Sequence, residues 1–139
     1  MTADVALVAC SKIKVGDQVA VQDLYSSPLF RMSRRYAEAN AHNWFILSAE
    51  HGLLDPKTMV RRYDTTLNSM SAMDRRTWVN GVTAQMKAEE VKGRRLLILA
   101  GNVYRSGLMQ FLWTRFDEIA IPMEGLKIGE QLSWLSKRM

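Results

Sequence analysis

Cysteine, histidine and proline are scarce in this sequence, and the first two scarcities limit the chemistry available to it. The 139 residues include one cysteine, two histidines and three prolines. Because Cys10 has no partner, the chain forms no intramolecular disulfide and holds no cysteine-rich metal site. The two histidines, His42 and His51, do not have the spacing of metal ligands. We therefore expect neither a metal nor another cofactor.

Long hydrophobic runs are also missing. No apolar segment approaches the roughly 18 residues that a membrane-spanning helix needs. The first residues, Met-Thr-Ala-Asp, lack the basic region and the apolar core of a secretory signal peptide. We expect a cytoplasmic protein that does not enter a membrane. Repeats, linkers and low-complexity segments are absent too, so the length fits one α/β domain over residues 1–139.

A modest excess of positive charge is what the composition does contain. The net charge is +5 at pH 7, and the isoelectric point is near 9.6. Such a field favours partners that carry phosphate. A dedicated DNA-binding module would present a denser basic face. We expect a nucleic acid or a nucleotide as the partner.

Short apolar segments alternate with helical patterns along the chain. The apolar segments are typical of buried parallel strands and cover residues 5–9, 44–47, 96–99 and 118–121. Helices are predicted over 28–39, 72–92, 102–116 and 128–137, with Ser27, Ser71 and Asn102 as N-caps. This alternation predicts a three-layer α/β sandwich with a four-stranded, mainly parallel sheet and helices on both faces. Residues 11–22 and 48–68 are predicted as loops, the second an ordered wall or lid.

The carboxyl ends of these strands would meet at one edge of the sheet, where ligands bind in open parallel sheets. The loop after the first strand contains Cys10, Ser11, Lys12 and Lys14. Its backbone amides, hydroxyl and ammonium groups can hold a phosphate, although the glycines of a P-loop are missing. The alternative interpretation is a polar loop whose lysines are solvated and bind no ligand. Cys10 is then either a buried small hydrophobe or a nucleophile.

The loop after the second strand is the densest cluster of polar side chains. Ser48 is small enough to let a ligand approach, and Glu50, His51 and Asp55 are titratable. A partly buried carboxylate such as Glu50 can act as a general base. The alternative is structural: Glu50 caps a turn, His51 is solvated, and Asp55 supplies turn chemistry before Pro56.

Two further groups complete the predicted edge. Arg61 or Arg62 can meet a phosphate, Tyr63 can stack on a base, and Asp64 can accept hydrogen bonds from a polar ligand. Equally, Tyr63 anchors its loop to the core and Asp64 pairs with an arginine. Asn102 and Tyr104 follow the third strand at a helix N-terminus, which favours an anion or a polar base edge; Asn102 is otherwise only an N-cap.

Five segments together resemble an uncharacterised domain family of bacterial and phage proteins: residues 10–14, 24–30, 46–54, 63–67 and 125–129. More distantly, they are similar to a domain of the archaeal tRNA-guanine transglycosylases, to the peroxide-stress YaaA group and to the uracil-DNA glycosylase-like fold. The resemblance implies nucleic-acid or modified-base chemistry. The glycosylase motifs Gly-Gln-Asp-Pro-Tyr and His-Pro-Ser are absent from this chain.

These features predict an enzyme directed at nucleic acid or a nucleotide, hydrolysing an N-glycosidic bond of a normal or modified base in DNA. In duplex DNA the base would first have to leave the stack. The predicted catalytic residues are Glu50 and Asp64. The predicted substrate contacts are Ser11, Lys12, Lys14, Ser48, His51, Arg61, Tyr63, Asn102 and Tyr104. Two alternatives stay open: a non-catalytic nucleotide- or nucleic-acid-binding module of phage or bacterial origin, and a protein-interaction domain.

Overall fold

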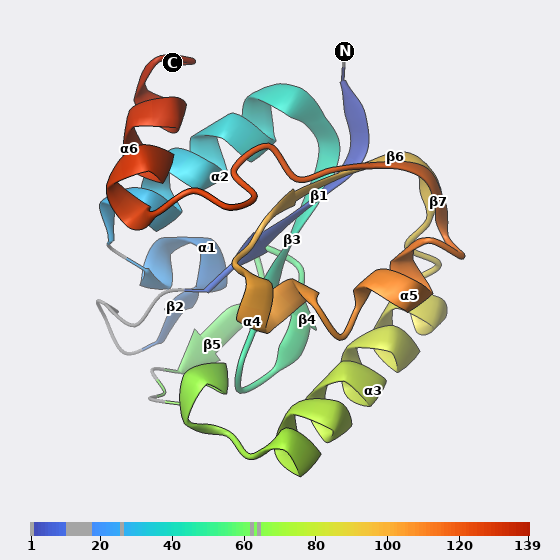
Figure 1. Ribbon diagram of the computed structural model, residues 1–139. Helices are drawn as coiled ribbons and strands as arrows, with labels where there is room; N and C mark the ends of the chain where they lie inside the picture. The colour runs from blue at the N-terminus through green and yellow to red at the C-terminus, as the bar shows by residue number, and fades with distance from the viewer. Residues whose placement is uncertain (1, 11–17, 26, 62, 64) are drawn as a thin grey trace.

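A central sheet with helices packed against it organises the chain (Figure 1). The computed structural model describes residues 2–10, 18–25, 27–61, 63 and 65–139. Strands β1 (Ala3–Ala9), β3 (Ala41–Ser48), β6 (Gly93–Leu99) and β7 (Phe116–Ala120) are parallel, and β4 (Gly52–Leu54) runs antiparallel to β3. The order is β4-β3-β1-β6-β7. The sheet thus has five strands instead of the predicted four, because the chain turns back directly after Ser48 and pairs with β3.

Alternate residues of the central strand enter two different hydrophobic clusters. Val5 and Leu7 of β1 lie in the cluster that includes residues of α3 (Ala72–Ala88). Ala6 and Val8 lie in the cluster that includes residues of α2 (Pro28–Asn40) and α6 (Ile128–Ser136). Successive side chains of a strand point to opposite faces of the sheet. Burial on both faces explains why the strands read as continuous apolar runs.

Two of the predicted helix starts are confirmed. Ser27 Oγ accepts a hydrogen bond from the Phe30 N–H at 3.1 Å, and Pro28 occupies the first position of α2. Ser71 Oγ accepts from the Asp74 N–H at 3.1 Å at the start of α3. Each side-chain oxygen satisfies an N–H group that has no partner within the helix.

The predicted helix over residues 102–116 is wrong. The segment forms two short helices, α4 (Asn102–Arg105) and α5 (Met109–Leu112), and Gly101 rather than Asn102 is the N-cap of α4. Between them, a Cβ on Gly107 would lie only 2.7 Å from Cγ2 of Val79 in α3. The missing side chain lets the junction of α4 and α5 pack tightly against α3.

The segments predicted as loops contain short elements of their own. These are β2 (Gln18–Ala20), α1 (Val21–Leu24), β5 (Met59–Arg61) and the 3₁₀ helix η1 (Leu67–Ser69). β2 and β5 pair antiparallel as a separate two-stranded sheet. Elements of three or four residues are too short to show a hydrophobic period, so the sequence pattern did not reveal them. Within the described ranges, no helix has the length and apolar character required to cross a membrane.

Alanine at Gly52 tests the turn that creates the fifth strand. Gly52 has a φ of +73°, and a Cβ there would lie 2.3 Å from Oε1 of Gln85, which accepts the Leu53 N–H at 2.8 Å. Gly52→Ala should lower the free energy of unfolding by about 2 kcal/mol, because it combines left-handed strain with a disturbed hydrogen bond.

Gly81→Ala is the matched control for this measurement. A Cβ on Gly81 meets no atom within 4 Å, and the residue lies inside α3. This substitution should raise the free energy of unfolding by about 1 kcal/mol through helix propensity. Denaturant unfolding of both variants measures the contrast, and a Gly52→Ala protein as stable as the unaltered one would contradict this turn.

Candidate functional site

Cys10 occupies the centre of the carboxyl edge of the sheet. It directly follows β1, and its N–H donates to the Leu47 carbonyl of β3 at 3.0 Å. Its Sγ lies 3.2 Å from the Tyr104 hydroxyl of α4. Trp78 of α3 packs edge-on against Tyr104, with 5.8 Å between the ring centroids. The loops that follow β1 and β6 therefore meet, as a parallel sheet requires.

A cavity of about 410 Å³ opens beside Cys10. It lies among the ends of β1 and β6, the start of α2 and the segment between β7 and α6. Its volume is in the range of small-molecule sites. The polar lining side chains are those of Cys10, Ser27, Ser33, Asn102, Arg105 and Gln131, and the larger apolar ones are those of Leu29, Phe30, Ile98, Leu99, Ile121, Met123 and Leu126.

Arg105 is the one charged side chain among the described residues that line this cavity. Its side chain is 12% exposed, and its Nη1 donates to the Ala100 carbonyl at 2.9 Å. Its Nη2 lies 3.5 Å from Oε2 of Glu124, whose side chain is 64% exposed. These contacts therefore hold a positive charge at the cavity wall.

The start of α2 adds to this positive potential. The N-cap Ser27 and Leu29 in the first turn of this 13-residue helix line the cavity. A helix N-terminus carries partial positive charge. The sequence placed the corresponding dipole at Asn102, but α4 has only four residues and contributes little of it. Arg105 and α2 together suit the cavity to an anion.

A network of buried hydroxyl groups fixes the end of β3. Ser48 is fully buried, and its Oγ donates to the Tyr63 hydroxyl at 2.8 Å and accepts the His51 N–H at 3.1 Å. The hydroxyls of Tyr63 and Tyr25 are hydrogen-bonded to each other. Trp78 Nε1 donates to the Ser48 carbonyl at 2.8 Å. Buried polar groups need such partners, so the network holds β3, α3 and the segment after β5 together.

Three phenol groups around Cys10 resist ionisation. Burial raises the pKa of Tyr25, Tyr63 and Tyr104, and the neighbouring Cys10 raises each pKa further. The phenols therefore remain protonated in neutral solution. They can orient a ligand or a neighbouring side chain through hydrogen bonds, and they are poor general bases.

The predicted site residues fall into separate groups in the structure. Asn102 lines the cavity, and Tyr104 contacts Cys10. Ser48 and Tyr63 belong to the hydroxyl network, in which Tyr63 anchors its segment to β3. Ser11, Lys12, Lys14 and Asp64 lie outside the described residues.

The remaining predicted residues are exposed, and none of them lines the cavity. Glu50 accepts a hydrogen bond from the Thr65 hydroxyl. The His51 ring meets Tyr63 edge-on at a centroid distance of 5.4 Å. Asp55 accepts the Lys57 N–H at 2.9 Å, which is the turn role that the sequence left as an alternative. Arg61 is the last residue of β5.

Tyr25, Ser27 and Arg105 were absent from the predicted site. Ser27 carried a clear capping signal, but that signal says nothing about what the helix start faces. Arg105 directly follows a predicted residue and was identifiable only by its neighbourhood. Tyr25 bonds to a residue 38 positions away, and no local pattern marks such a pair.

The buried phenols predict how stability depends on pH. Their pKa is higher in the folded protein than in the unfolded chain, where a tyrosine titrates near 10. Their contribution is therefore complete below about pH 10 and is lost as the pH rises above that value. Tyr104→Phe removes one of the three groups, so the free energy of unfolding should fall less steeply above pH 10 than in the unaltered protein. Denaturant unfolding at a series of pH values measures how steeply the free energy of unfolding falls in each protein. Equal slopes above pH 10 would argue against a raised pKa of Tyr104.

The chain is similar to one curated bacterial protein and to one family model, and the description of neither states an activity. The uncharacterized protein YfjM of Bacillus subtilis (strain 168) is 29% identical over 149 aligned positions, which cover 94% of this chain and 91% of that protein. No solved structure matches the chain. The model of a "Family of unknown function (DUF6884)" matches residues 5–137, a span that includes Cys10, the whole described cavity lining and the hydroxyl network. The chain belongs to this family of unknown function, DUF6884.

Proposed function

We propose that this protein binds a nucleotide, free or within a nucleic acid, in the cavity beside Cys10. The observation that carries the proposal is the charge of Arg105, the one charged side chain that lines the cavity among the described residues, beside both polar and apolar wall residues. A guanidinium binds phosphate with paired, charge-assisted hydrogen bonds. Phe30, Met123 and Leu126 offer an apolar surface to a base, and Asn102 and Gln131 carry amide groups that can read its polar edge.

Charge and resemblance support the same class of ligand. The net charge of +5 favours phosphate-bearing partners. A distant resemblance to YaaA-type and uracil-DNA glycosylase-like domains, if it reflects common chemistry, would place a nucleobase in the site. The packing of α2 and α6 against one cluster and of α3 against the other supports the three-layer sandwich of such domains. A protein-interaction domain would have its pocket filled by its own side chains, and the open volume of about 410 Å³ does not favour that alternative.

Two substitutions test the placement of the phosphate. Arg105→Gln should weaken the binding of a nucleoside 5′-monophosphate by at least tenfold, because hydrogen bonds to charged groups contribute about 1.5–3 kcal/mol. Glu124→Gln should strengthen binding by up to about fivefold, because this exposed carboxylate competes with the phosphate for Arg105.

Isothermal titration calorimetry measures both effects, with the corresponding nucleoside as the control ligand. The nucleoside lacks phosphate, so its affinity should be nearly the same for the unaltered protein and for both variants. Arg105→Lys separates loss of charge from loss of the paired donors. If Arg105→Gln binds the monophosphate as tightly as the unaltered protein, Arg105 does not hold the phosphate.

The catalytic form of this proposal is hydrolysis of an N-glycosidic bond in which Glu50 or Asp64 positions the attacking water. Glu50 lies just beyond the end of β3, and its contact with Thr65 orients the carboxylate. No carboxylate among the described residues lines the cavity. The bond to be cleaved would therefore have to lie outside the cavity, towards β3. The geometry supports binding more strongly than catalysis.

Release of bases from oligonucleotides tests the catalytic form. Single-stranded and duplex oligonucleotides with normal and modified bases should acquire abasic sites, detected by alkaline cleavage. Glu50→Gln should reduce the rate about a hundredfold or more, the usual contribution of a general base. Glu89→Gln, exposed at the end of α3, should leave the rate unchanged. If no substrate acquires abasic sites at high protein concentration, the catalytic form is wrong and the binding proposal is unaffected.

A further inference from the structure

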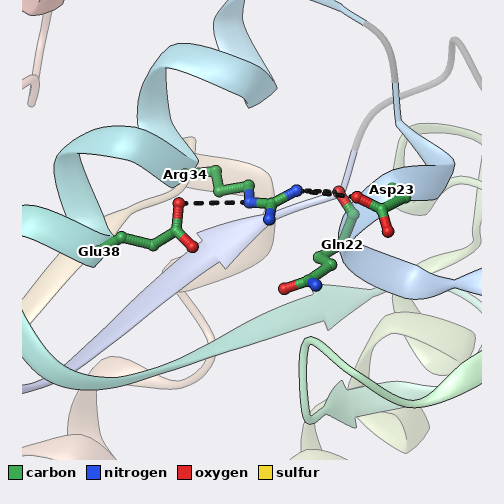
Figure 2. A network of polar contacts seen from close by, with 4 residues as sticks. All are labelled: Gln22, Asp23, Arg34 and Glu38. Carbon is green, nitrogen blue, oxygen red and sulfur yellow. Dashed lines mark hydrogen bonds and ion pairs between the residues drawn. The ribbon is translucent and has the colours of Figure 1, made fainter.

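Helix α2 carries arginines with two different roles, and the first role is structural. Arg34 Nη1 donates to the Gln22 carbonyl and to Asp23 Oδ1, both at 3.1 Å, and its Nε donates to Glu38 Oε1 at 3.3 Å. Figure 2 shows this guanidinium between the two carboxylates. Its Cζ also lies 5.9 Å from the centre of the Trp44 ring. Arg34 therefore ties α2 to α1 and is committed to the fold.

Arg31 and Arg35 have no comparable role in the fold. Both are exposed, and no acidic side chain of the described residues forms an ion pair with either. Residues four apart lie on the same face of a helix, where like charges repel each other. Together with Pro28 and Met32, the two arginines border a surface hollow of about 320 Å³. An anion bound there would relieve this repulsion.

The hollow and the cavity share the first turns of α2. Leu29, Phe30 and Ser33 of this helix line the cavity, whereas Pro28, Arg31, Met32 and Arg35 line the hollow. The 3.6-residue period puts these two sets on opposite sides of the helix. A helix with its side chains is about 10 Å across. A strand that leaves the cavity must pass around half of the helix circumference, roughly 15–20 Å, so it can reach the arginines within a few nucleotides.

We infer that the nucleotide in the cavity belongs to a single-stranded polynucleotide whose neighbouring phosphates bind Arg31 and Arg35. The inference rests on the proposed function and deepens it, since it names the polynucleotide instead of the free nucleotide as the partner. A free nucleotide has its phosphate inside the cavity and does not need a second cationic site outside. A single strand supplies phosphates on both sides of the bound base and needs no unpairing before the base enters.

Matched pairs of arginine substitutions test this assignment. Arg31→Gln/Arg35→Gln removes the proposed contacts, and Arg76→Gln/Arg94→Gln removes the same charge from exposed positions on α3 and β6. The probes are a labelled single-stranded DNA of about 12 nucleotides, within the usual range of site sizes, and a nucleoside 5′-monophosphate. Fluorescence anisotropy over a series of salt concentrations gives the affinity for the DNA, and calorimetry gives the affinity for the monophosphate.

The first pair should weaken DNA binding by tenfold or more at low salt. It should also reduce the slope of log affinity against log salt by about 1.4, because each phosphate contact on a single strand contributes about 0.7. Its affinity for the monophosphate should stay the same. The control pair should retain the slope of the unaltered protein.

The inference is overturned if Arg31→Gln/Arg35→Gln has the same salt slope as the unaltered protein. It is also overturned if Arg76→Gln/Arg94→Gln loses as much affinity for the DNA. Monophosphate binding would then still support the proposed function. If the unaltered protein binds neither the DNA nor the monophosphate, both proposals are wrong. Vesicles that contain phosphatidylserine form a separate arm: if they bind through Arg31 and Arg35 and the DNA does not bind, these arginines recognise a lipid surface and the inference is wrong.

Discussion

Parallel pairing of β1 with β3 on one side and β6 on the other underlies every feature of the candidate site. The register pairs Ala9 with Leu47 and Val8 with Leu99, so that Cys10 emerges level with the ends of both neighbours. Its thiol thereby reaches a tyrosine that lies 94 positions further along the chain. A shift by one residue would turn every side chain of β1 to the opposite face and mix the two hydrophobic clusters. Burial on both faces therefore specifies the register, and the register positions the edge.

Cys10 separates two regions with different physical character. On one side, Ser48, Tyr63 and Tyr25 form a hydrogen-bonded network in which buried hydroxyl groups satisfy each other. Such networks favour one arrangement because each member would pay a desolvation penalty if its partner moved. On the other side lies an open cavity whose described lining holds one charged side chain, Arg105, together with polar side chains such as Asn102 and Gln131. Cys10 lines the cavity and neighbours the tyrosines of the network, so the two regions share this residue.

Helix α2 connects the electrostatics of the cavity to the core. Phe30 and Ala37 bury one face of the helix, and Arg34 ties another face to α1, so the position of the helix is fixed from two directions. Its first turn consequently stays at the cavity, close to Arg105. The nearly buried guanidinium of Arg105 needs polar partners. The Ala100 carbonyl is a partner that a ligand would not displace. Glu124 supplies an exposed one that an anion can replace.

Local signals in the chain were enough to predict the parallel strands and the helix caps at Ser27 and Ser71, because apolar runs and capping residues act over a few neighbouring positions. The order of strands and helices also predicted that polar loops meet at one edge of the sheet. The local signals missed β4 and the β2–β5 pair, since a three-residue strand exists only through its partner. They also extended one helix through Gly107, where contact with Val79 decides the path. Naming polar residues in a loop did not show which of them would face a cavity: Glu50 lies in solvent, and Arg105 is held at the wall. That choice belongs to long-range packing, because burial and charge environment depend on residues that meet only after the sheet has formed.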